Sequence, residues 1–137
     1  MSAEFLDTSV LIYAHDASSP RRRTIAIDLI ERLSAERTGR ISTQVLLEFF
    51  AAVTRKLRMR ASVAAEILED LATWTVHAPA ADDALEAARL ASRHSLSIRD
   101  AMIVRSALQS GCGILWSEEL PHGRRFQSMV VRNPFTD

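Results

Sequence analysis

Positions 3–14 of the chain read AEFLDTSVLIYA. The apolar pair Phe5-Leu6 is typical of a short buried strand, and the second apolar run predicts a helix that the two intervening hydroxyl residues can cap. A strand that runs into a helix is the start of a βα unit, and open parallel sheets bind ligands just outside the carboxyl ends of their strands. Asp7 lies at that point. Because a carboxylate between apolar runs is costly to desolvate, the sequence predicts that other groups compensate Asp7.

The composition is that of a globular protein. The chain has 137 residues, of which 47% are hydrophobic and 25% are charged, and 17 basic side chains balance 17 acidic ones. This length favours one domain over residues 1–137. The single Cys112 excludes an internal disulfide and a Cys-rich zinc site. We find no signal-peptide pattern and no apolar run long enough for a membrane span, so we expect a cytoplasmic protein.

Short strands alternate with longer helices along the rest of the chain. Strands are predicted at 40–43, 74–78 and 113–116, with a further edge strand at 129–131. Helices are predicted to end by Thr38-Gly39, with glycine as C-cap, and to cover 44–58 behind a Thr43 cap, 62–71, 80–94 and the segment from Ser97 to Gly111. This pattern predicts an α/β sandwich with a mostly parallel sheet and right-handed crossovers.

Acidic residues follow three of these predicted strands. Asp7 follows the first, Glu48 lies one helical turn past the second, and Glu118-Glu119 follow the strand at 113–116. Asp100 instead begins the apolar face of a helix. If the strands are parallel, the acids gather at one edge of the sheet, where their mutual repulsion calls for a cation. Oxygen ligands favour Mg²⁺ or Mn²⁺, and such ions support phosphodiester hydrolysis.

Each acid also has a plainer interpretation. Asp7 can be an ordinary N-cap, and Ser97 with Asp100 forms a capping-box pattern. Glu48 and Glu118-Glu119 can be solvated surface acids. Other enzyme classes fit less well. A haloacid-dehalogenase-type phosphatase requires Asp where Ser9 stands, the single Lys56 comes too early for that class or for a receiver domain, and no Gly-rich phosphate loop precedes a lysine.

Four segments resemble, in order, the motifs of the PIN-domain ribonucleases. They are DTSVLIYA at 7–14, ISTQVLLEF at 41–49, LSIRDAMI at 96–103 and GILWSEEL at 113–120. The resemblance covers essentially the whole chain, and the single-domain size is similar to that of the VapC toxins within the family. It implies a PIN-like α/β/α sandwich and an endoribonuclease that depends on Mg²⁺ or Mn²⁺ and leaves 3′-hydroxyl and 5′-phosphate ends.

The resemblance also implies roles for individual residues. Asp7, Glu48, Asp100 and Glu119 correspond to the catalytic acids, and Asp7, Asp100 and Glu119 to the metal ligands. Glu119 stands where the family usually has aspartate, and Glu118 remains the alternative for that position. Thr8, Ser9, Thr43 and Ser117 are expected to cap helices and to orient the acids.

The expected partners follow from the same resemblance. Single-domain members of this kind usually form homodimers and are inhibited by a VapB-type antitoxin whose tail enters the acidic site. RNA contact is predicted for Arg99, Arg55, Lys56 and Arg58, because an acidic site needs nearby positive charge to hold a phosphate backbone. The alternative function is a PIN-like module that binds RNA or protein without cutting, which the Glu119 departure keeps open.

Overall fold

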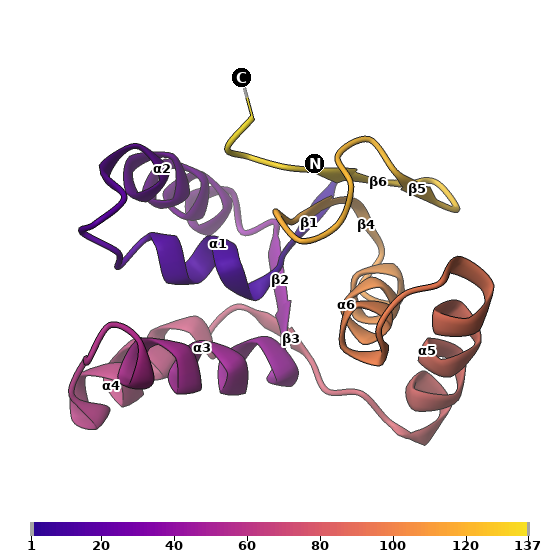
Figure 1. Cartoon of the computed structure of the whole chain (residues 1–137), viewed down its shortest axis with the longest axis horizontal. Helices are drawn as coiled ribbons and strands as arrows, with labels where there is room; N and C mark the ends of the chain where they lie inside the picture. The colour runs from indigo at the N-terminus through magenta and orange to yellow at the C-terminus, as the bar shows by residue number, and fades with distance from the viewer. Residues whose placement is uncertain (1, 137) are drawn as a thin grey trace.

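A computed structural model describes residues 2–136 as six strands and six helices around one sheet (Figure 1). The strands are β1 (Ala3–Leu6), β2 (Gly39–Ser42), β3 (Thr75–His77), β4 (Cys112–Trp116), β5 (Arg125–Phe126) and β6 (Met129–Arg132). The helices are α1 (Thr8–Tyr13), α2 (Pro20–Glu36), α3 (Thr43–Arg55), α4 (Ala61–Leu71), α5 (Ala81–His94) and α6 (Ile98–Gln109).

The sheet has the strand order β3-β2-β1-β4-β6-β5. All neighbouring strands pair in parallel except β5 and β6, which are antiparallel. The predicted α/β sandwich with a mostly parallel sheet is therefore confirmed. The prediction of an edge strand at 129–131 was wrong in one respect. β6 lies inside the sheet between β4 and β5, and the two-residue β5 forms that edge.

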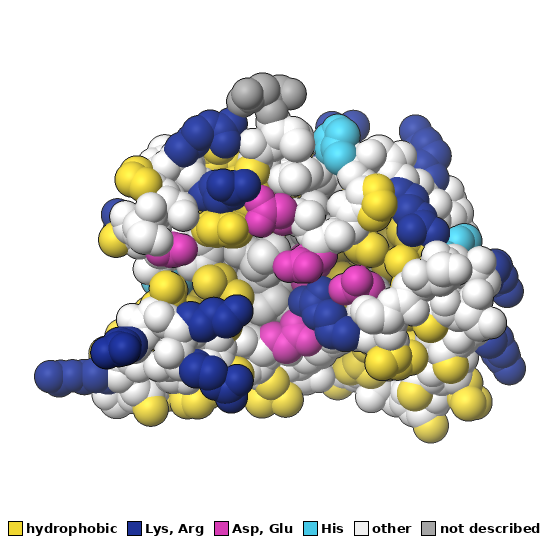
Figure 2. Space-filling model, viewed as in Figure 1, with side chains coloured by type: hydrophobic (Ala, Val, Ile, Leu, Met, Phe, Trp, Pro, Cys, Tyr) yellow, Lys and Arg dark blue, Asp and Glu magenta, His cyan; other side chains and the backbone are white. Residues whose placement is uncertain are grey.

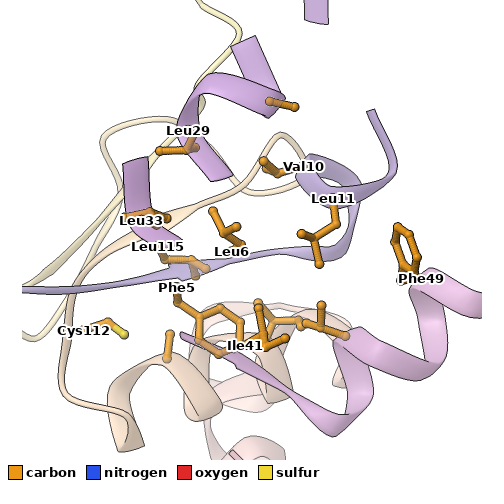
Figure 3. Packing of buried hydrophobic residues seen from close by; sticks show 14 of the residues in the cluster. Phe5, Leu6, Val10, Leu11, Leu29, Leu33, Ile41, Phe49, Cys112 and Leu115 are labelled. Carbon is orange, nitrogen blue, oxygen red and sulfur yellow. The ribbon is translucent and has the colours of Figure 1, made fainter. Parts of the chain in front are cut away.

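The sheet is covered on both faces. In Figure 1, α1 and α2 lie on one side of the strands, α5 and α6 lie on the other, and α3 and α4 pack near the carboxyl ends of β1 and β2. Figure 3 shows Leu6 pointing toward Leu29 and Leu33 of α2, whereas Phe5 points to the opposite side of β1. Successive side chains of a strand point to opposite faces of the sheet, and because both faces are covered, Phe5 and Leu6 are both fully buried.

Two predicted helix caps were wrong. Ser42, not Thr43, caps α3: its Oγ accepts a hydrogen bond from the backbone N–H of Val45 at 3.3 Å. Arg37, not Gly39, adopts the left-handed conformation that ends α2. Gly39 lies in β2 beneath the Trp74 ring, where a Cβ atom would approach the ring to 2.2 Å. A glycine near a helix end thus serves packing rather than capping here.

Among the helices of residues 2–136, none has the length and apolar character that crossing a bilayer demands.

Candidate active site

Asp7 lies at the carboxyl end of the central strand, where β1 continues into α1. Its side chain is fully buried. The Oδ1 atom accepts a hydrogen bond from the backbone N–H of Thr8 at 2.7 Å, and Oδ2 accepts one from Ser117 Oγ at 2.7 Å. The Asp7 N–H donates to the Trp116 carbonyl at 2.9 Å, which joins the ends of β1 and β4. Asp7 is therefore the N-cap of α1, and its carboxylate is compensated both by the first residue of α1 and by the residue that follows β4.

Glu48 projects from α3 toward the same point. Its Oε1 accepts a 2.7 Å hydrogen bond from Thr8 Oγ1, and its Oε2 accepts one from Gln44 Nε2 at 3.1 Å. Burial alone would raise the pKa of Glu48, but the hydrogen bonds from Arg99, Thr8 and Gln44 together lower it below its ordinary value. Glu48 is thus held in its ionised form.

Asp100 arrives from the first turn of α6, which Ser97 caps through the backbone N–H of Asp100 at 3.1 Å. The neighbouring Arg99 joins it to the other acids. Arg99 Nη1 lies 3.0 Å from Asp100 Oδ1 and 3.4 Å from Asp7 Oδ2, so both carboxylates lie within reach of one nitrogen atom. Arg99 Nη2 lies 2.7 Å from Asp7 Oδ1 and 2.6 Å from Glu48 Oε1. Three segments distant in sequence converge on one guanidinium.

This convergence is visible on the surface. Figure 2 shows acidic side chains gathered in the middle of the face around a basic one. A cleft of about 230 Å³ opens at this point, and it is lined by Thr8, Ser9, Ile12, Glu48, Ala52, Arg99 and Glu119. The site therefore combines carboxylates with an opening to solvent.

The two adjacent glutamates after β4 have different surroundings. Glu119 lines the cleft with Glu48 and Arg99. Glu118 accepts a hydrogen bond from Tyr13 Oη at 3.1 Å and forms an ion pair with Arg22 at 2.8 Å. The geometry therefore favours Glu119 as the fourth acid of the site and gives Glu118 a role in joining α1 to α2.

The predicted supporting residues divide in the same way. Thr8 and Ser117 contact the acids directly. Ser9 lines the cleft, and its buried Oγ has no hydrogen-bond partner among the described residues. Thr43 is exposed, and the capping that was predicted for Thr43 is performed by the adjacent Ser42.

Comparisons with known proteins agree with this geometry. The family model for the PIN domain matches residues 5–119, which include all four acids. This chain belongs to the PIN domain family. No curated protein matches its sequence.

Solved structures show the same fold. VapC20 of Mycobacterium tuberculosis, described as a sarcin-ricin-loop-cleaving toxin, superposes with a TM-score of 0.67 at 24% identity, covering 85% of this chain and 92% of the other. VapBC2 of Rickettsia felis bound to promoter DNA gives 0.65 at 20%, covering 96% and 98%. DNA-bound VapBC of Salmonella typhimurium gives 0.66 at 18%, covering 98% and 99%. At these identities the likeness is one of fold.

The oxygen atoms available as metal ligands at this site of the PIN domain suit a hard divalent cation. The facing groups are carboxylate and hydroxyl oxygens, which Mg²⁺ and Mn²⁺ prefer, and the unpartnered Ser9 Oγ adds one more available oxygen. As the side chains stand in residues 2–136, no three Asp, Glu, His or Cys groups are arranged to hold an ion. The Arg99 guanidinium lies among the acids instead.

Two site residues of this PIN domain have roles that the sequence did not predict. Arg99 was predicted to contact RNA, but in the structure it pairs with the acids. Gln44 was not singled out, although its Nε2 donates to Glu48 and to the Arg99 carbonyl at 3.3 Å. No local signal identified the role of Arg99, because a basic residue in the first turn of a helix opposes the helix dipole by only about 0.3–1 kcal/mol, which an exposed arginine tolerates without acidic partners.

Proposed function

We propose that this PIN domain is a Mg²⁺- or Mn²⁺-dependent endoribonuclease and the toxin of a VapBC-type toxin–antitoxin pair. The observation that carries the proposal is the convergence of Asp7, Glu48 and Asp100 at the carboxyl edge of a PIN-fold sheet. Membership of the PIN family and the shared fold with VapC structures support the choice of RNA cleavage over other phosphodiester chemistry.

The proposed mechanism assigns a task to each acid. Asp7 and Asp100 would hold the ion directly, with Glu119 reaching it from the cleft wall, and Glu48 would orient a water molecule. A bound Mg²⁺ or Mn²⁺ would supply a more acidic water and a positive charge for the scissile phosphate. The chain's own contribution is positioning. Ser117 and Thr8 fix the oxygens of Asp7 and Glu48 through hydrogen bonds of 2.7 Å each.

Substrate binding would use the basic residues that border the cleft face. Arg55, Lys56 and Arg58 are exposed at the end of α3 and in the turn that follows it. Figure 2 shows basic side chains above and below the hollow beside the acidic cluster. Such groups suit backbone phosphates, which supply affinity without selecting a sequence. The identity of the cleaved RNA would depend on its shape and on a few base contacts.

The proposed partners are a VapB-type antitoxin and a second copy of the chain. The toxin–antitoxin complexes from Rickettsia felis and Salmonella typhimurium share this fold over nearly the full length of both chains, which supports the antitoxin. The family resemblance supports the homodimer. Both partners are tested by co-expression with the product of any small reading frame that neighbours this gene, followed by light scattering: the proposal expects a complex built on a toxin dimer.

A second candidate function is an RNA- or protein-binding module without catalysis. Two observations favour it: Arg99 already pairs with the three acids, and Glu119 is longer than the family's usual aspartate. Under this reading the acidic cluster is structural, and removing one carboxylate leaves RNA or partner binding unchanged.

One experiment separates the two functions. The purified protein is incubated with total RNA in Mg²⁺, Mn²⁺ or EDTA, alongside Asp7→Asn, Asp100→Asn and the control Asp28→Asn, an exposed acid of α2. We expect cleavage only with metal, a loss of more than about 100-fold in both site variants and wild-type activity in the control. RNA binding without cleavage by the wild type, or full activity of both site variants, would reject the nuclease.

A further inference from the structure

Arg99 contacts all three acids that converge on the site. Its Nη2 atom lies 2.7 Å from Asp7 and 2.6 Å from Glu48, its Nη1 atom lies 3.0 Å from Asp100, and its Nε atom lies 3.2 Å from both Glu48 oxygens. Nη2 also lies 3.2 Å from Thr8 Oγ1. A guanidinium has five donors in a rigid plane, so it can bridge several carboxylates at once. These donors occupy the space between the acids.

The charges explain why this arrangement is stable. The Asp7 side chain is completely buried, and uncompensated carboxylates in such surroundings are strongly destabilising. Burial alone would lower the pKa of Arg99, but its bonds to Glu48 and Asp7 raise it well above the ordinary value, so the guanidinium stays charged. Arg99 therefore supplies, from within the chain, one of the positive charges that the three acids require.

A divalent ion would need oxygen atoms of Asp7 and Asp100 that Arg99 contacts. In residues 2–136 no three acidic, His or Cys side chains are arranged to hold an ion, and oxygens of Asp7, Glu48 and Asp100 face the Arg99 nitrogens instead. Arg99 is also able to leave. Its side chain is 32% exposed and lines the cleft, and it stands on the first turn of α6 rather than in the core. Loading an ion and moving the guanidinium outward are thus one exchange of cations.

We propose that Arg99 is a built-in counter-cation of the metal-free protein, which stabilises the acidic site and competes with the divalent ion for the carboxylates of Asp7 and Asp100. The inference rests on the proposed function only in that the site must accept such an ion. Because only molecules whose guanidinium has moved aside can bind the ion, the fraction of such molecules sets how much free metal is needed to load the site.

The test measures metal binding directly, using Mn²⁺ and no RNA. Mn²⁺ affinity is determined by titration calorimetry for the wild type, Arg99→Gln and Arg105→Gln. Arg105 is a matched control because it lies on the same helix and pairs with the buried Asp83 at 2.9 Å, outside the site. We expect Arg99→Gln to bind Mn²⁺ more tightly by about 10- to 1,000-fold, the inverse of an open-state population of about 0.1–10%. Arg105→Gln should bind like the wild type.

A second measurement follows Arg99 itself. In the ¹⁵N spectrum of the wild type, the Arg99 Nε–H signal is assigned by its absence from Arg99→Gln, and Mg²⁺ is then added. We expect the signal to shift toward that of solvent-exposed arginines as the ion loads, while NaCl of equal ionic strength leaves it in place. If Arg99→Gln folds only when Mn²⁺ is present, this dependence also supports the proposal, and Arg99→Lys, which retains the charge, should fold without metal.

Several outcomes would overturn the inference. Equal or weaker Mn²⁺ binding by Arg99→Gln would show that the guanidinium does not compete, and an Arg99 signal unmoved by saturating Mg²⁺ would show the same. Failure of every variant to bind Mn²⁺ would overturn both this inference and the metal-dependent nuclease. Tighter binding by Arg99→Gln in a protein that cuts no RNA would support the inference and reject the nuclease alone.

Discussion

Ser117 Oγ donates a 2.7 Å hydrogen bond to Oδ2 of Asp7, a residue 110 positions earlier in the chain. The two residues follow the neighbouring parallel strands β1 and β4, so the sheet itself sets their separation. Ser117 Oγ also accepts hydrogen bonds from the N–H groups of Glu119 and Leu120, at 3.1 and 3.2 Å. One hydroxyl thus fixes both the first acid and the backbone that carries the fourth.

Replacing Ser117 by alanine tests this link. The variant leaves Oδ2 of a fully buried carboxylate without this donor, so we expect unfolding to become easier by about 1–3 kcal/mol in urea titrations. Metal affinity or RNA cleavage should fall by about 10- to 100-fold, as is usual when a ligand loses its orienting partner. Ser18→Ala, in an exposed turn, should change neither quantity. Wild-type stability and activity in Ser117→Ala would contradict the assignment.

The adjacent glutamates offer a matched pair. Glu119→Gln should weaken Mn²⁺ binding in calorimetry, because Glu119 lines the cleft beside Glu48 and Arg99. Glu119→Asp keeps the charge and should stay close to the wild type. Glu118→Gln should leave Mn²⁺ binding unchanged and reduce stability by less than about 1 kcal/mol, since it loses only a partly exposed ion pair with Arg22. A stronger metal effect of Glu118→Gln would exchange the two assignments.

Low pH should reduce the stability of the fold, in part through protonation of Glu48. Its pKa in the folded chain lies below the ordinary value of 4.5, so its ionised form stabilises the fold fully above pH 4.5. That contribution is lost as the pH falls through the lower, folded value. Urea unfolding between pH 7 and pH 3 should therefore show a smaller loss of stability for Glu48→Gln than for the wild type. The exposed Glu66→Gln serves as control, and equal pH dependence in all three proteins would refute the prediction.

The contact between Gly39 and Trp74 predicts an intolerant position in β2. A methyl group at Gly39 would lie 2.2 Å from the Trp74 ring, so Gly39→Ala should cost about 1–3 kcal/mol of stability, seen as a lower Tm. Gly113→Ala in β4 is the control, because its added carbon would meet only Ser2 at an ordinary 3.9 Å. Combining Gly39→Ala with Trp74→Ala should cost less than the two changes summed, since the second removes the clash.

Local patterns in the sequence predicted much of this protein. The strand–acid–helix pattern around Asp7, the apolar stripe of α3 and the S-x-x-D start of α6 depend on residues a few positions apart, and all three appear where expected. One error arose because the adjacent residues Ser42 and Thr43 can both cap a helix, and Ser42 is the one that does. A second error arose because the glycine at position 39 was assigned to a helix end, whereas it makes room for the ring of Trp74, a contact between distant residues.

By itself, the sequence determined the fold class and the edge of the sheet at which the acids gather, because a parallel sheet brings the carboxyl ends of its strands together. Only the tertiary structure decided what compensates those acids. Arg99 and Asp7 are 92 positions apart, and nothing in the spacing of either residue announces their 2.7 Å contact. The contacts of a charged side chain with buried partners depend on how whole helices and strands pack together. A local sequence pattern does not determine that packing.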